Sequence, residues 1–178
     1  MKKLIYPLLG VILVCVITSC EDNKRAKNYN NYTAAIDEQG KVFIEKGLEA
    51  GLAEIKASKL AMTNSKNPRV INFAKMMISD HTKSGDELEK IGISKRVAEG
   101  DTVSAAHQQI IKSLSSKLGV IFDGAYMQMM VNDHEDAIKL FNGAAQNNNT
   151  AIQNFAKKTL PTLKMHLDSA KAISASLK

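Results

Sequence analysis

The sequence predicts an all-α protein built as a four-helix bundle, on the basis of three observations. Apolar residues recur at helical spacing in four long segments and one short segment, and no segment shows the alternation of a half-buried strand. Short turns join the long segments into two pairs. One long connection, which carries the short segment, joins the two pairs. Two antiparallel pairs linked by a long crossover with a short extra helix form the ferritin-like arrangement.

The first pair of helices is expected over 37–64 and 68–91. Glycines lie inside the first of them and cost about 1 kcal/mol each relative to alanine, which indicates a close approach to another helix. The second begins with a strong start signal, because Asn67 can cap it and Pro68 suits its first position. The few residues between the two segments allow only a tight turn, so these helices should be antiparallel neighbours.

The second half of the chain repeats this organisation after a long connection. A short helix is expected over 103–117, and two long helices are expected over 120–146 and 150–176. The turn Asn147-Asn148-Asn149 separates the last two. Each long helix has about 25 residues and a length of roughly 37 Å.

The first part of the chain reads as an export signal rather than as part of the fold. Residues 1–19 combine basic residues near the start with an apolar run over 8–17. They lead into the lipobox Ile17-Thr18-Ser19-Cys20, and the whole segment is similar to bacterial lipoprotein signals. The apolar run is too short to cross a bilayer core, which needs roughly 20 residues. We expect cleavage before Cys20 and attachment of lipid to its thiol. The mature chain would then be anchored in the bacterial cell envelope, at the outer membrane and facing the periplasm.

Residues 20–36 are expected to form the lipidated cysteine and a flexible tether, and residues 37–178 the helical bundle domain. Cys15 leaves with the signal and Cys20 carries lipid, so the domain has no free thiol for a disulfide, a nucleophile or a zinc site. Its basic residues are scattered, without interleaved aromatic residues. Binding to nucleic acid is therefore not expected.

A repeated motif marks the centre of the predicted bundle. The pattern Met-Met-x-x-Asp-His at 76–81 returns at 129–134, and Asn-Phe-Ala-Lys at 72–75 returns at 154–157, shortly before the last histidine. Three of the four histidines replace apolar residues in the inward rows of their helices: His81, His134 and His166. Each lies near the middle of its expected helix. Residues at mid-length share one layer whichever way their helices point, so these imidazoles should meet.

The first long helix adds a carboxylate to this layer. Glu54 lies at the edge of the apolar face near the middle of the helix, whereas Glu45 and Glu49 are expected to point toward water. The layer then predicts a metal site with four ligands: Glu54, His81, His134 and His166. Nearby side chains would orient these histidines or serve as additional ligands: Asp80, Asp133, Met77, Met130 and Tyr126. Imidazole and carboxylate suit copper, zinc or iron, and methionine sulfur favours copper.

Two other candidates are assigned structural roles. His107 is expected to pack or cap on the short helix, and Asp123 to place a negative charge near the start of a helix, where the helix dipole favours it. No catalytic residue is expected. A di-iron oxidase centre needs Glu three residues before His on two helices, and no histidine in this chain has one.

Several motifs resemble one known family. They are A-E-I-x-x-S-K-L-A at 53–61, N-P-x-V-x-x-F-A-x-x-M-x-x-D-H-T at 67–82, F-D-x-x-Y-M at 122–127, M-V-x-D-H at 130–134 and F-A-x-x-T-L-P-x-L-x-x-H-L at 155–167. The chain resembles, over about 38–175, the ferritin-like bacterial envelope family called domain of unknown function four-one-four-two. The resemblance implies a ferritin-like bundle and no particular activity.

The sequence thus predicts an envelope-anchored lipoprotein that binds a metal ion or a small ligand at its layer of histidine and carboxylate, without catalysing a reaction. The alternative is a structural or protein-interaction module of the envelope. In that case the buried histidines would form hydrogen bonds that hold the helices in register, each contributing about 1 kcal/mol.

Overall fold

The computed structural model describes residues 36–97 and 102–177. These residues form five α-helices: α2 (Glu38–Asn64), α3 (Pro68–Ser94), α4 (Ala105–Ser115), α5 (Gly119–Ala144) and α6 (Thr150–Ala175). The predicted signal peptide, the lipidation of Cys20 and nearly all of the predicted tether lie outside the described residues.

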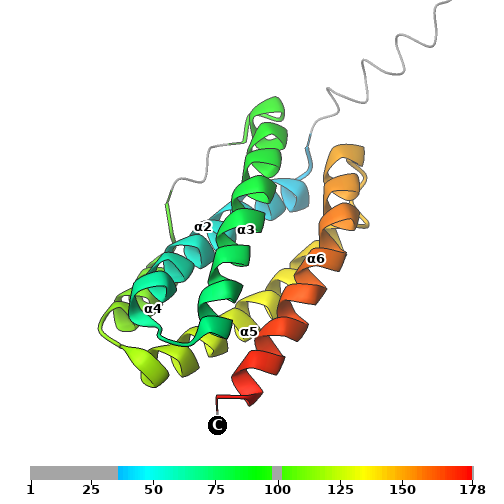
Figure 1. Cartoon of the computed structure of the whole chain (residues 1–178). Coiled ribbons are helices and arrows are strands. Elements are labelled where there is room, and N and C mark those ends of the chain that lie inside the picture. Colours follow the sequence, from blue (N-terminus) through cyan, green and yellow to red (C-terminus); the bar gives the residue numbers. More distant parts are fainter. Residues whose placement is uncertain (1–35, 98–101, 178) are drawn as a thin grey trace, which may run out of the picture.

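The helices form the predicted ferritin-like four-helix bundle. In Figure 1, α2 packs along α3, and α5 packs along α6; the two pairs meet where α2 contacts α5 and α3 contacts α6. The helix α3 ends at the upper end of the bundle, whereas α5 begins at the lower end. The chain must therefore return along the bundle between them, and α4 lies on this return, against α2.

The predicted ends of the helices are correct to within a few residues. The second helix continues to Ser94 instead of 91, and the short helix covers 105–115 instead of 103–117. The start of α3 is capped as the sequence suggested. The side chain of Asn67 accepts a hydrogen bond from the Arg69 amide at 2.9 Å, and Pro68 follows it in the first turn.

The interior consists of two apolar clusters. One contains Phe73 and Tyr126, and the other contains Phe43, Phe141 and Phe155. In α3, α5 and α6, residues of the first cluster lie on one side of the central histidine and residues of the second cluster on the other. The histidines and Glu54 thus form a buried polar layer between two apolar halves. Among residues 36–97 and 102–177, no helix is long and apolar enough to span a membrane.

Candidate metal centre

Four polar side chains from four different helices converge at the middle of the bundle. Glu54 comes from α2, His81 from α3, His134 from α5 and His166 from α6, and all four are buried. The centroids of the three imidazole rings lie 5.3 to 5.6 Å apart. One ring nitrogen from each histidine lies within 4.8 Å of the other two. The structure therefore brings together the four residues that the sequence placed in one layer.

Hydrogen bonds fix which nitrogen of two rings carries the proton. His134 Nδ1 lies 2.9 Å from the Met130 carbonyl oxygen, and His166 Nε2 lies 3.1 Å from Asp80 Oδ2. Both partners are acceptors, so in the neutral rings these nitrogens donate. The other nitrogens, His134 Nε2 and His166 Nδ1, then carry lone pairs, and they face each other at 3.3 Å. Two lone pairs in this position repel each other unless a cation lies between them.

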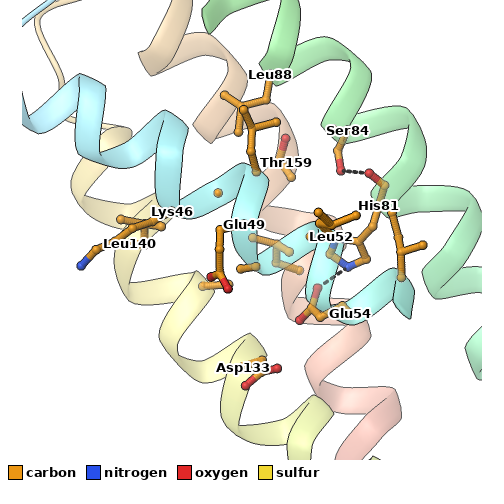
Figure 2. A pocket seen from close by; sticks show the side chains of 18 of the residues that line it. Lys46, Glu49, Leu52, Glu54, His81, Ser84, Leu88, Asp133, Leu140 and Thr159 are labelled. Carbon is orange, nitrogen blue, oxygen red and sulfur yellow. Dashed lines mark hydrogen bonds and ion pairs between the residues drawn. The ribbon is translucent and has the colours of Figure 1, made fainter. Parts of the chain in front are cut away.

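Glu54 contacts the other two members of the layer. Its Oε2 lies 3.0 Å from His81 Nε2, and its Oε1 lies 3.2 Å from His134 Nδ1. Figure 2 shows Glu54 on α2 pointing toward the ring of His81. The contact with His81 is close but poorly aligned, so His81 Nε2 forms no hydrogen bond although it is buried. An unsatisfied buried nitrogen of this kind costs about 1–3 kcal/mol.

Burial keeps the imidazoles in the form that binds metal. It lowers the pKa of His81 to about 3, with a further contribution from the neighbouring histidines, and it lowers the pKa of His134 to about 4. The pKa of His166 is also lowered by burial, against the opposing effect of Asp80. Burial, with the nearby Asp133 and Glu49 carboxylates, raises the pKa of Glu54 well above its usual value. The three rings are therefore neutral near pH 7, as metal ligands must be.

Two of the residues that were predicted to orient the histidines form hydrogen bonds with them. Asp80 orients His166 as described, and Met130 supplies the carbonyl that orients His134. Met77 is fully buried in the same apolar cluster as Tyr126. The Tyr126 hydroxyl shares a hydrogen bond with Ser58 Oγ at 2.8 Å, on the Glu54 side of the layer.

Asp133 differs from its prediction, because it pairs with the fourth histidine. Its Oδ2 lies 3.6 Å from His107 Nε2, while His107 Nδ1 lies 2.7 Å from Glu49 Oε1. Glu49, expected to point toward water, is partly buried and also accepts a hydrogen bond from the Ser104 amide at 2.8 Å. His107 therefore links α4 to α2 and α5. Helical periodicity alone gave no signal for this link, because it depends on where α4 docks.

Asp123 lies near the start of α5 as expected, and it is also enclosed. It was expected to be a charge near the start of a helix, but its side chain is buried and its Oδ1 has no hydrogen-bond partner. The neighbouring Phe122 is fully buried as well, and Asp123 follows directly after the first turn of α5.

The fold and the site define a class: all-α bundles of the ferritin-like type, in which facing helices direct histidines and a carboxylate into the core. The chain belongs to the family described as Domain of unknown function (DUF4142), whose model matches residues 26–173. This confirms the resemblance seen in the motifs.

Comparison with solved structures supports the fold. The chain is similar to the crystal structure of a DUF305 fragment from Deinococcus radiodurans, with a TM-score of 0.72 and 11% sequence identity. The similarity covers 80% of this chain and 99% of that chain. At this identity it concerns the fold alone. A comparison with curated proteins gives no match.

Proposed function

We propose that this protein binds a transition-metal ion at the cluster formed by His81, His134 and His166, without catalysing a reaction. The observation that carries the proposal is the 3.3 Å approach of His134 Nε2 to His166 Nδ1, because the hydrogen bonds of the other ring nitrogens leave both atoms as acceptors. A metal ion between these nitrogens turns a repulsion into two coordinate bonds. The unsatisfied ring of His81 is close enough to supply a third ligand.

The contacts around the rings match those of known metal sites. Histidine ligands usually donate their second N–H to a carboxylate or a backbone carbonyl, which fixes the ring and strengthens the ligand. His166 does so with Asp80, and His134 does so with Met130. Glu54 lies against His81 and His134 and is available as a fourth ligand or as an anchor for the rings.

The donor set favours copper or zinc over iron. Neutral imidazoles bind all three metals, and the affinity of such a site for divalent ions rises from iron to copper and falls again at zinc. The absence of Glu three residues before any histidine argues against a ferritin-type di-iron centre. A binding role therefore fits the residues better than oxidative catalysis.

A structural role for the layer is the alternative. The hydrogen bonds of His134 and His166 would also hold helices in register. However, a structural network gains most when every member is satisfied, and His81 Nε2 is not. An apolar layer would fill the same position at lower cost.

A thermal-melt screen tests the metal proposal. The full chain, stripped with a chelator, is melted in the presence of copper, zinc, iron or manganese. We expect the midpoint to rise with copper and with zinc, because ligands that bind only the folded state stabilise it. His81→Ala should lose most of this rise. No rise with any metal would leave the structural role as the better explanation.

We also propose that the chain is a lipoprotein of the bacterial envelope, anchored through Cys20 at the outer membrane and facing the periplasm. The lipobox at 17–20 supports this location. We expect labelled palmitate to be incorporated into the wild-type chain and not into Cys20→Ser, and the variant to leave the membrane fraction. Membrane retention of Cys20→Ser would contradict a lipid anchor.

A further inference from the structure

A cavity of about 590 Å³ lies inside the bundle beside the histidine layer. Its volume falls in the range typical of sites for small organic molecules. Residues of α2, α3, α5 and α6 line it. Of the proposed metal cluster it reaches Glu54 and His81, whereas His134 and His166 do not line it. The cavity is therefore a neighbouring space and is separate from the gap between the facing nitrogens.

Most of the wall is apolar. Leu88 lies on the α3 side, and Phe141 and Phe155 lie on the side of α5 and α6. Figure 2 shows Leu52 and Leu88 directed into this region. These side chains suit the apolar body of a ligand, such as one or two rings.

The wall formed by α2 carries no side chain next to His81, because Gly51 lies there. A Cβ atom added at Gly51 would have one neighbour within 4 Å, His81 Nδ1 at 3.7 Å. A Cβ atom at Gly85, which also lines the cavity, would have none. Both glycines lie inside helices, where alanine is favoured. Larger side chains at either position would occupy open space at the cavity.

The polar part of the lining is mainly acidic. Six carboxylates contribute to it, against a single lysine, Lys46: Glu49, Glu54, Asp86, Glu89, Asp133 and Asp136. Glu49 and Asp133 come together at His107, and Figure 2 shows both beside Glu54. Asp133 Oδ2 lies 3.6 Å from His107 Nε2, and the Asp133 side chain keeps 14% of its surface exposed at the cavity. A carboxylate that lines a mostly apolar cavity is a partner for a protonated amine.

We propose that this cavity binds a small organic cation, with an apolar body between the leucine and phenylalanine side chains and a protonated amine donating to Asp133. Glu49 lies close enough, through the shared contact with His107, to add to the attraction. The amine would form a charge-assisted hydrogen bond with the Asp133 carboxylate, and the apolar body would displace water from the apolar walls. This proposal does not depend on a bound metal.

The test compares three compounds that share a ring system and differ in head group: 1-naphthylmethylamine, 1-naphthylmethanol and 1-naphthoate. The full chain is held in phosphatidylcholine nanodiscs with a chelator, and binding is measured by equilibrium dialysis against empty nanodiscs. The chain has no tryptophan, so naphthalene fluorescence reports the ligand with little background. We expect the amine to bind about tenfold more tightly than the alcohol, and the carboxylate to bind most weakly.

Variants test separately whether binding needs the charge of Asp133 and the open space beside the glycines. Asp133→Asn should weaken binding of the amine by about tenfold and leave the alcohol unchanged. Gly51→Leu should block all three compounds, and Gly85→Leu serves the same purpose if the first variant does not fold. The matched control is Asp168→Asn, because Asp168 is exposed on α6 and does not line the cavity.

Three outcomes would overturn the proposal: no binding above empty nanodiscs, equal binding of the three compounds, or equal losses in Asp133→Asn and Asp168→Asn. Because a chelator is present throughout, none of these outcomes bears on metal binding. Conversely, a thermal midpoint that does not rise with any metal would not contradict the proposed site for an organic cation.

Discussion

Lowering the pH from 7 to 5 is expected to reduce the free energy of unfolding of the metal-free protein. The three buried imidazoles cause this loss. In the folded chain the pKa of His81 is about 3 and that of His134 about 4, and that of His166 is lowered as well, whereas an unfolded histidine titrates near 6.5. Below pH 6.5 the unfolded chain therefore binds protons that the folded layer excludes.

Glu54 opposes this pH dependence. Its pKa is raised in the folded protein, so the folded chain keeps a proton that the unfolded chain loses above its usual pKa of 4.5. His81 and His134 each lower the free energy of unfolding by about 2 kcal/mol between pH 7 and 5. His166 adds to this loss, and Glu54 offsets part of it. Stability should therefore fall as the pH drops through the unfolded histidine pKa.

Urea denaturation at pH 7, 6 and 5 in the presence of a chelator measures this change. His81→Leu removes one of the three rings while keeping an apolar side chain in its place. We expect the loss between pH 7 and 5 to be smaller in this variant by about 2 kcal/mol. An equal loss in the wild type and His81→Leu would mean that the His81 ring is charged in the folded state, contrary to its burial.

The histidine layer was predictable because helical periodicity encodes it. Each of the three histidines replaces an apolar residue in the inward row of its helix and lies near the middle of that helix. Position along a helix gives height in the bundle, and the apolar row gives direction. Together these place His81, His134 and His166 in one space, which is where the structure has them.

The partners of these residues were less predictable, as the two Asp-His motifs show. An aspartate one residue before a histidine is rotated from it by about 100° around the helix, so the two cannot point the same way. Asp80 reaches His166 on α6, whereas Asp133 reaches His107 on α4. The same motif thus serves two different contacts, because the neighbouring helix differs. Sequence spacing contains no information about that neighbour.

The apolar clusters show why a polar layer at this position points to a function. Both halves of the core are filled by aromatic and aliphatic side chains, and an apolar middle layer would join them into one cluster. Instead the chain buries four ionisable groups there, and one of them, His81, has a nitrogen without a hydrogen bond. Such an arrangement lowers stability in the metal-free state, and binding of a cation would recover it.

Removal of a single imidazole from the cluster is expected to weaken metal binding by on the order of 100-fold. Structural zinc sites with four ligands contribute about 10–16 kcal/mol, so one ligand corresponds to roughly 3 kcal/mol or two decades of affinity. His134→Ala should show this loss, because its Nε2 is one of the two facing nitrogens. Asp80→Asn should lose about 10–100-fold, because His166 would keep its position but lose the carboxylate that strengthens it as a ligand.

The fourth histidine provides the matched control for this prediction. His107 also contacts two carboxylates, but it links α4 to α2 and α5 and lies outside the three-histidine cluster. Titration calorimetry of the full chain with copper and zinc should therefore give one bound ion with unchanged affinity in His107→Ala. If His107→Ala lost as much affinity as His134→Ala, the metal would lie at the Glu49 and Asp133 end of the cavity instead. Equal affinity in the wild type and His134→Ala would leave no role for the facing nitrogens, and the proposed centre would be wrong.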